Sequence, residues 1–511
     1  MQETTDQAKP VQDSESPEAP VEKRSTVRRK FLGLVLGVVA AIATFYALPA
    51  DMPEAARATT TVAVVMAVWW MTEAIPIAAT SLLPIVLFPV LGVTDTSSAA
   101  SPYAAEVVFL LLGGYMLGQA MQRWTLHRRL ALLVILGVGT NPVKLVAGFM
   151  LVTAFISLWV SNAASTVMML PIGLSVLMMV RQMSGGKIES NFGCALMLGI
   201  AYAATIGGMA SIVSTPPNAL LIGYLADSHD IHITFLDWFT FGFPIAAVFL
   251  FLAWIILTRV VFPIRVRKVE GSKEAIREDL RSMGPLAAGE WAVIAIFVFA
   301  AFSWVAVPLL ADSALIGNAL PWLAHVTDAG IAMTVALLLF LVPVKPGKGV
   351  KVLDWGSTKE IPWGMLLLVG GGLSLSAQIT ESGLADWIGD QATVLSMLPA
   401  LAVILAIGVT ISLLTELTSN TAAAATFIPL FGGIAIGLDL PVLLLVLPAV
   451  LTTQMAFMLP VATPPNAMAF GTGYVTMGQL IRGGALLNLL GLVLMTVAMY
   501  TLAGWVFGFT F

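Results

Sequence analysis

Long stretches without a single charged side chain are the feature that most constrains this chain. One of them, residues 145–180, runs for 36 residues between two basic groups. Only 11% of the 511 residues are charged and 58% are hydrophobic, whereas about 25% of the residues of an average soluble domain are charged. A soluble core could not hide so much apolar surface, so most of the chain must lie in lipid. The sequence therefore predicts an all-α polytopic membrane protein.

The inventory of reactive side chains excludes several classes of protein. The chain has four histidines and one cysteine, Cys194, too few for a disulfide framework or a Cys/His metal cluster. Its net charge of −4 argues against a nucleic-acid partner. We find no Gly-x-Ser-x-Gly elbow and no nucleotide-binding loop, and all four histidines fall in predicted loops. The chain is predicted not to be an enzyme, and direct ATP drive is not expected.

The N-terminal residues carry two signals. Residues 1–30 are rich in Glu, Asp, Ser and Pro with a basic end, which is typical of a disordered cytoplasmic tail. The run 26–32 resembles a twin-arginine export signal. Because many apolar segments follow, we interpret 31–54 instead as the first transmembrane helix with a basic flank.

The positions of lysine and arginine predict the topology. Basic side chains gather in a few polar gaps, while other gaps carry only acids. Under the positive-inside rule the basic gaps are cytoplasmic. Threading eleven transmembrane helices on this basis places all 25 basic residues inside except Arg57. This predicts a multi-pass protein of the plasma (inner) membrane, with a cytoplasmic N-terminus and an external C-terminus.

Two apolar runs fit hairpins better than crossings. Residues 145–180 have Lys144 and Arg181 at their ends. They are too short for two full spans, and one crossing would put a basic end outside. We expect a re-entrant hairpin that opens to the cytoplasm. Residues 397–438 are flanked by acids, so this second hairpin is expected to open to the outside.

The two halves of the chain match each other with opposite polarity. The first repeat is predicted at 55–262, a cytoplasmic linker at 263–290, and the second repeat at 291–511. A Leu-Leu-Leu-Gly-Gly segment at 110–114 resembles the segment at 366–371. An inverted repeat with paired broken helices is typical of secondary transporters.

Each half contains one Thr-Pro-Pro-Asn sequence inside an apolar run, at 215–218 and 463–466. Proline at the first helical position with threonine before it is an N-cap arrangement. Such a break starts a half-helix within the membrane, whose free N–H groups suit an anion. The alternative is a proline kink, which membrane helices tolerate. Two breaks in matching positions favour the half-helix.

Each predicted hairpin also has a Ser-Asn tip, at 161–163 and 418–421. Hydroxyl, amide and backbone oxygens at an unwound turn suit a small cation such as sodium. The alternative is that these residues only join helices. No lysine, arginine or histidine lies within a predicted span, so an anionic substrate would need co-bound cations. Glu416, three residues before the second tip, could tune a cation site, whereas Glu73 is expected to fix a turn.

At these motifs the chain resembles the divalent anion/sodium symporter family, the INDY-type dicarboxylate transporters. The resemblance covers about 55–500 and includes the segments 69–76 and 463–467. The second tip has the family's Ser-Asn-Thr pattern, while the first has Ala163 in the third position. The resemblance implies a homodimer in lipid, with a scaffold domain and a transport domain that moves as an elevator.

The resemblance also implies the site residues, motif by motif. It assigns sodium to two or more sites built from Ser157, Ser161, Asn162 and Ser214, and from Thr415, Thr418, Asn420 and Ala462. It assigns the small anionic substrate to Asn162, Ala163, Thr215, Pro216, Asn420, Thr421, Thr463 and Pro464.

The function that follows is sodium-coupled import of C4-dicarboxylates such as succinate, malate and fumarate. Alternatives within transport are a sodium-independent dicarboxylate exchanger and a sodium-coupled citrate or sulfate transporter. A passive channel is a further alternative, but inverted repeats with re-entrant tips favour alternating access.

Overall fold

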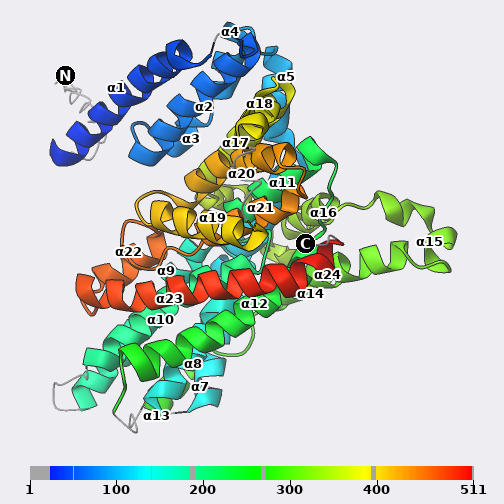
Figure 1. Cartoon of the computed structure of the whole chain (residues 1–511). Coiled ribbons are helices and arrows are strands. Elements are labelled where there is room, and N and C mark those ends of the chain that lie inside the picture. The colour runs from blue at the N-terminus through cyan, green and yellow to red at the C-terminus, as the bar shows by residue number, and fades with distance from the viewer. Residues whose placement is uncertain are drawn as a thin grey trace, which may run out of the picture.

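The computed structural model describes residues 24–49, 51–139, 141–183, 190–265, 272–392 and 399–508. These parts are almost entirely helical (Figure 1). Their one sheet is a short antiparallel pair, β1 (Pro343–Lys345) and β2 (Val350–Lys351). Among the described residues, eight helices are long and apolar enough to cross a membrane, and six shorter apolar helices accompany them. The all-α polytopic fold is therefore confirmed, and the count of eleven crossings stays a prediction.

The helices of the first half run from the N-terminal part of the chain to the linker between the halves. They are α1 (Arg24–Ala47), α2 (Glu54–Thr72), α3 (Ile77–Thr80), α4 (Leu83–Val90), α5 (Thr96–Ala100), η1 (Ser101–Ala104), α6 (Glu106–Arg123), α7 (Leu126–Val138), α8 (Pro142–Ser157), α9 (Asn162–Met183), α10 (Ser190–Met209), α11 (Pro216–His229), α12 (Phe235–Ile255), η2 (Ile256–Val261) and α13 (Ser272–Ser282).

The second half follows the same plan. Its helices are α14 (Ala288–Ala311), α15 (Ile316–Ala319), η3 (Pro321–His325), α16 (Asp328–Leu341), η4 (Pro346–Lys348), η5 (Trp355–Glu360), α17 (Trp363–Glu381), α18 (Leu384–Ala392), α19 (Ala400–Thr415), α20 (Asn420–Gly437), α21 (Val442–Thr453), α22 (Pro464–Gly471), α23 (Met477–Ala498), η7 (Met499–Ala503) and α24 (Gly504–Phe507).

Details of the helices repeat between the halves. The pairs α8/α9 and α19/α20 are each interrupted by four residues, and each second helix begins at the tip asparagine. Both second helices contain a proline, Pro171 and Pro429, at the same distance from that asparagine. Both α12 and α23 run on into a π-helical turn, η2 and η7. The order of elements therefore occurs twice, as the motifs predicted.

Several polar gaps are helical where loops were expected. Helix α1 begins at Arg24, inside the segment assigned to the tail, because arginine and lysine are good helix formers and extend the apolar helix outward. Helices α7 and α18 precede the two hairpins, and α13 lies in the linker 263–290. All three are too short or too polar to count as spans, which is why the charge pattern did not reveal them.

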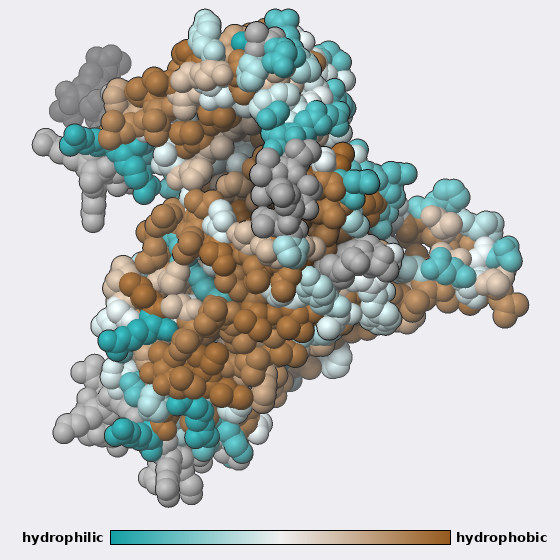
Figure 2. Space-filling model, in the orientation of Figure 1, coloured by the Kyte–Doolittle hydropathy of each residue, from teal (hydrophilic) through white to brown (hydrophobic). Residues whose placement is uncertain are grey.

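Helix α10 lies at the centre of the molecule, and every residue from Phe192 to Met209 is buried. Glycines let its neighbours approach closely: a Cβ on Gly207 would collide with the backbone of Ala154 in α8. The outer helices instead expose apolar side chains, and hydrophobic residues cover much of the face shown in Figure 2, with hydrophilic residues along its edges. This distribution is that of a protein surrounded by lipid.

Two arginines close to the apolar region have defined partners, although Arg57 Nε is buried without a hydrogen bond. Arg57, which the topology left outside, donates from Nη2 to the Phe45 carbonyl oxygen at 2.9 Å and lies 4.7 Å above the Phe45 ring. Arg129 in α7 is buried and donates to both carboxylate oxygens of Glu290 in α14, at 2.6 and 3.1 Å. This bidentate pair fixes the start of the second half against α7.

Candidate functional site

The first tip and the first break lie against each other. Helix α9 begins at Asn162, and Ser161 Oγ accepts a hydrogen bond from the N–H of Ala164 at 3.3 Å. The hydroxyl of Ser214, in the break before α11, donates to the carbonyl oxygen of Val160 at 3.3 Å. The tip of one hairpin and the unwound part of another helix thus form one unit, as the cation assignment requires.

Gly208 shows how close the first group of residues lies. A Cβ at this position would be 2.9 Å from Ser214 Oγ, 2.8 Å from Thr215 Cγ2 and 3.6 Å from Ser157 Oγ. Ser157 Oγ itself donates to the Ala204 carbonyl oxygen at 2.6 Å. Three candidate residues from α8 and the break therefore converge on one glycine of α10, where a side chain would displace Ser214 and Thr215.

The second tip shows the corresponding arrangement. Thr415, the last residue of α19, has its Oγ1 2.8 Å from Asn420 Oδ1 and 2.8 Å from the Thr453 carbonyl oxygen at the end of α21. A hydroxyl has one proton, so Thr415 donates to only one of these oxygens at a time. The Thr418 hydroxyl donates to the Leu414 carbonyl oxygen at 3.0 Å. The tip of the second hairpin is thereby joined to the end of α21, the helix that precedes the second break.

The fourth residue of each Thr-Pro-Pro-Asn motif holds the loop before it. Asn218 Nδ2 donates to the Ser211 carbonyl oxygen at 2.9 Å and to that of Met209 at 3.2 Å. Asn466 Nδ2 donates to the carbonyl oxygens of Ala456 and Leu459, at 2.9 and 3.1 Å. The unwound segments are therefore fixed conformations, which excludes a simple proline kink as the description of either break.

The two threonines of these motifs differ in their contacts. Thr463 caps α22 by accepting from the Asn466 N–H at 3.3 Å. Thr215 makes no cap. Its hydroxyl lies 3.1 Å from Gln454 Oε1, and Gln454 Nε2 lies 2.7 Å from Asn218 Oδ1. Gln454 follows α21 and is 2% exposed, so it joins the first break to the second half.

Glu416 is engaged by the backbone of the second break. Its carboxylate, 2% exposed, accepts from the N–H groups of Met458 and Leu459 at 2.9 Å each and from Asn488 Nδ2 at 2.7 Å. Asn488, in α23, also accepts from the Phe457 N–H at 3.2 Å. The acid therefore stabilises the loop 457–459. Glu73 lies at a turn, since it ends α2 with a positive φ of 50°, but its carboxylate is exposed and pairs with Arg29 of α1 at 3.2 Å.

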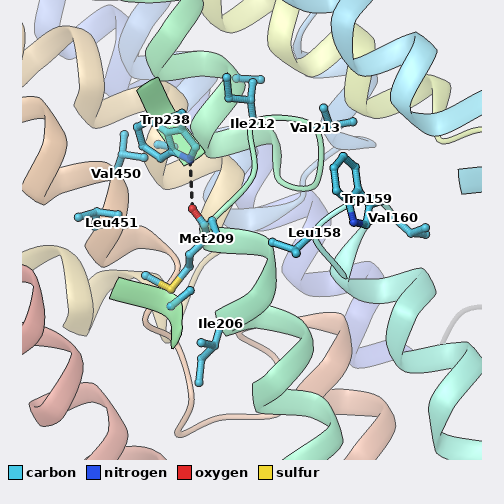
Figure 3. Close-up of a cluster of buried hydrophobic side chains, with 14 of the residues drawn as sticks. Leu158, Trp159, Val160, Ile206, Met209, Ile212, Val213, Trp238, Val450 and Leu451 are labelled. Atoms are coloured by element: carbon cyan, nitrogen blue, oxygen red, sulfur yellow. Dashed lines mark hydrogen bonds between the residues drawn. The ribbon is translucent and has the colours of Figure 1, made fainter. Parts of the chain in front are cut away.

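Apolar side chains surround the first tip and break. Figure 3 shows residues 158–160 of the tip and 212–213 of the break within one buried cluster. The indole N–H of Trp238 donates to the Met209 carbonyl oxygen at 3.1 Å, which satisfies the last turn of α10. In such surroundings unpaired polar groups are costly, so the polar atoms of the site must be paired with one another or with ligands.

The side chains of the tips and breaks that could bind a cation are neutral apart from Glu416. The described residues contain no group of three or more His, Cys, Asp or Glu side chains that could hold a metal ion. The tips and breaks offer hydroxyl, amide and backbone oxygens, together with the N-termini of α9, α11, α20 and α22. Oxygen ligands of this kind suit hard cations, and helix N-termini suit anions.

The structure joins most of the sequence-predicted residues, but not all. Ser157, Ser161, Ser214 and Thr215 belong to one group, and Thr415 and Asn420 to the other. In the described part of the chain no hydrogen bond links Ala462 with Asn420, and none links Thr421 to the rest of the site. Sequence reasoning missed Gln454 and Asn488. Their only signal was an amide side chain within a long apolar run.

Comparison with known proteins adds the following. The family model described as the sodium:sulfate symporter transmembrane region matches residues 28–508. Sodium-dependent dicarboxylate transporter SdcS of Staphylococcus saprophyticus is 36% identical over 485 residues, covering 94% of this chain and 92% of that protein. SdcS of Staphylococcus aureus is 35% identical over 477 residues, covering 92% and 91%.

Two solved structures are similar in fold. The YdaH transporter of Alcanivorax borkumensis has a TM-score of 0.55 at 14% identity, covering 94% of this chain and 98% of that one. MtrF of Neisseria gonorrhoeae, described with a class of antimetabolite efflux pumps, has a TM-score of 0.50 at 13% identity, covering 93% and 94%. At these identities the likeness concerns the fold alone.

Proposed function

Because this chain belongs to the sodium:sulfate symporter family, we propose that it is a secondary active transporter that imports C4-dicarboxylates together with sodium. The observation that carries the proposal is the pair of tip-and-break units, which combine neutral oxygen ligands with helix N-termini. Relatives that match over more than nine-tenths of this chain are sodium-dependent dicarboxylate transporters. Their name supports the choice of dicarboxylate over sulfate.

The hydroxyl groups support cation binding. Ser157 and Ser214 donate their protons to backbone carbonyl oxygens. The oxygen of such a hydroxyl keeps its lone pairs for a cation. We assign one sodium ion to Ser157, Ser161, Asn162 and the backbone of Ser214. We assign a second to Thr415, Asn420 and the backbone of Thr418 and Ala462.

The substrate carboxylates belong beside these cations. Each half offers a tip amide, Asn162 or Asn420, and a half-helix N-terminus, at Pro216 or Pro464. No basic side chain accompanies them in the described tips and breaks. The charge of a dianion would then be compensated by sodium and by helix N-termini. This dependence on cations is the physical reason for expecting symport. Thr421 and Thr463 complete the second half-site, and Thr215 and Ala163 the first.

The movement that we propose is that of an elevator. The hairpins α8/α9 and α19/α20, with α10–α12 and α21–α23, form the transport domain, and the remaining spans form the scaffold of a homodimer in the plasma (inner) membrane. The hairpins open to opposite sides, and the N-terminus is cytoplasmic. Support comes from the repeated order of elements and from the glycine-lined contacts of α6 with the tip and the break.

Uptake of labelled succinate into proteoliposomes tests the proposal. An inward sodium gradient should drive accumulation, and replacing sodium with choline should abolish it. A parallel sample loaded with succinate distinguishes exchange: uptake in choline only when counter-substrate is inside would identify an exchanger. Competition by citrate and by sulfate tests the other substrates. Equal uptake in choline without counter-substrate would contradict sodium symport.

A further inference from the structure

We propose that Gln454 positions Thr215 so that the break of the first half-site cannot donate a hydroxyl hydrogen bond to the substrate, which makes the two ends of the binding site chemically different. The inference rests on the proposed function and assigns a selectivity-determining role to a residue outside the binding motifs. It concerns the end of the substrate held by the first tip and break.

The orientation of the Gln454 amide follows from its neighbours. Asn218 directs its NH2 group toward the carbonyl oxygens of Met209 and Ser211. Its Oδ1 therefore faces Gln454 and requires a donor, which only Nε2 can supply, at 2.7 Å. Gln454 Oε1 must then face Thr215, so the Thr215 hydroxyl donates to it at 3.1 Å.

This leaves the first half-site without a free hydroxyl proton at its break. The Ser214 proton goes to the Val160 carbonyl oxygen and the Thr215 proton to Gln454. Ala163 has no hydroxyl at all. Toward a ligand, Thr215 presents only acceptor lone pairs, which a carboxylate oxygen cannot use.

The second half-site differs at both corresponding positions. Thr463 accepts from the Asn466 N–H, and no acceptor for its own proton occurs among the described residues. The hydroxyl of Thr421, which stands where the first tip has Ala163, likewise has no hydrogen-bond partner in the described chain. Both remain available to a carboxylate.

The halves differ because a glutamine stands where the first half has a glycine. Gln454 precedes Met455-Ala456, and Gly208 precedes Met209-Ala210. Gly208 has no side chain, and it lies beside Ser214 and Thr215 of the first break, so it provides no counterpart of Gln454 for the second break. Asn466 Oδ1 is accordingly buried without a partner, whereas Asn218 Oδ1 is paired.

The consequence is a substrate held by one carboxylate at the second half-site and recognised loosely at the first. A ligand can carry a hydrogen-bond donor, such as a carboxamide, on the end that the first half-site holds, and this donor can pair with Thr215. The class of substrate therefore extends from dicarboxylates to half-amides of the same length. We expect succinamate to compete for succinate uptake, with its carboxylate at the second half-site.

The test is the ratio of inhibition constants, succinamate over succinate, in sodium-driven uptake. Replacing Gln454→Met keeps the shape of the side chain and frees the Thr215 proton for a carboxylate. A hydrogen bond to a charged group contributes about 1.5 kcal/mol or more, so the ratio should rise roughly tenfold. General damage to the fold would affect both ligands equally. A matched control is Gln378→Met in α17, which removes the hydrogen bond of another buried glutamine, to Glu381, outside the tips and breaks.

Two further variants keep the test decisive. Adding Thr215→Val to Gln454→Met should return the ratio to the wild-type value, because the gain requires the hydroxyl. Ala163→Thr supplies a donor at the same half-site with Gln454 intact, and should also raise the ratio. If neither Gln454→Met nor Ala163→Thr changes the ratio while succinate uptake is sodium-driven, the role of Gln454 is wrong. Absence of succinate uptake by the wild-type protein would overturn the proposed function as well.

Discussion

At the scale of single residues, hydroxyl protons and amide orientations distinguish two sites that look alike in sequence. Both tips contain Ser-Asn and both breaks contain Thr-Pro-Pro-Asn. The structure gives the Asn420 amide a contact with Thr415, while among the described residues Asn162 Oδ1 accepts only from the N–H of its successor, Ala163, at 2.8 Å. Asn420 is therefore the better anchored of the two candidate ligands.

We expect Asn420→Ala to weaken apparent succinate affinity more than Asn162→Ala. Loss of a hydrogen bond to a charged group costs about 1.5–3 kcal/mol, or roughly tenfold to a hundredfold in affinity. The larger loss belongs to Asn420 because Thr421 shares its carboxylate. The measurement is the succinate concentration for half-maximal uptake, with each variant first shown to fold and insert. A greater loss for Asn162→Ala would contradict this order.

Glu416→Gln should destabilise the second break. The carboxylate accepts from two backbone N–H groups and from Asn488, and an amide would direct its NH2 toward one of these donors. The expected loss is about 1.5–3 kcal/mol, visible as a lower thermal transition in detergent and a weaker response to sodium. Glu73→Gln is the matched control, because its ion pair with Arg29 is exposed. Equal behaviour of the two variants would show that the buried contacts are dispensable.

The residues of the tips and breaks could be predicted because hydroxyl and amide side chains are rare at membrane depth. The hydrogen-bond partners of Glu416 and the contacts of Gln454 with the first break could not be predicted. They depend on which segments far apart in the chain meet around the loop 453–459, and no spacing rule connects Gln454 to Asn218.

At the scale of elements, the two interrupted helix pairs α8/α9 and α19/α20 are the feature on which the topology depends. The charge-free runs 145–180 and 397–438 predicted hairpins, and in the structure each run is interrupted directly before the tip asparagine, which starts α9 or α20. Helices α7, α13 and α18 were missed because a charge pattern locates spans and says little about short amphipathic helices outside them.

We expect cysteines placed at Lys144 and Arg181 to react with a membrane-impermeant thiol reagent from the cytoplasmic side only. They lie in the outer ends of α8 and α9, and a re-entrant hairpin returns to the side from which it entered. A cysteine at Asp439, after α20, should react from the outside. The buried Cys194 is first replaced by alanine to remove background labelling. Labelling of Lys144 and Arg181 from opposite sides would mean a true crossing.

At the scale of the whole molecule, the family assignment made from the motifs is confirmed, since the family model spans residues 28–508. The all-helical membrane fold is confirmed as well. Domain boundaries, dimerisation and the sliding movement stay predictions. They depend on how two packed bodies move past each other, which neither charge patterns nor motifs contain.

The contact between α6 and the first break tests that movement. A Cβ on Gly114 would collide with the side chain of Val213, which is β-branched and has little freedom to yield. We expect Gly114→Ala to disfavour this conformation and lower succinate uptake at least tenfold at equal protein amounts. The control is Gly137→Ala in α7, where a Cβ meets nothing within 4 Å. Wild-type uptake by Gly114→Ala would show that this contact is free to separate.

The glutamine that contacts the first end of the site, and that corresponds to a glycine in the other half of the chain, bears on how such a protein can be re-engineered. If the two ends of the binding site were identical, a substitution that alters ligand binding at one end would be expected to have an equivalent at the other. Here the variable positions, 163 and 454, both act on the first end and leave Thr421 and Thr463 untouched. A small library at these two positions should therefore vary what is tolerated at one end of a ligand while the grip on the other carboxylate is kept.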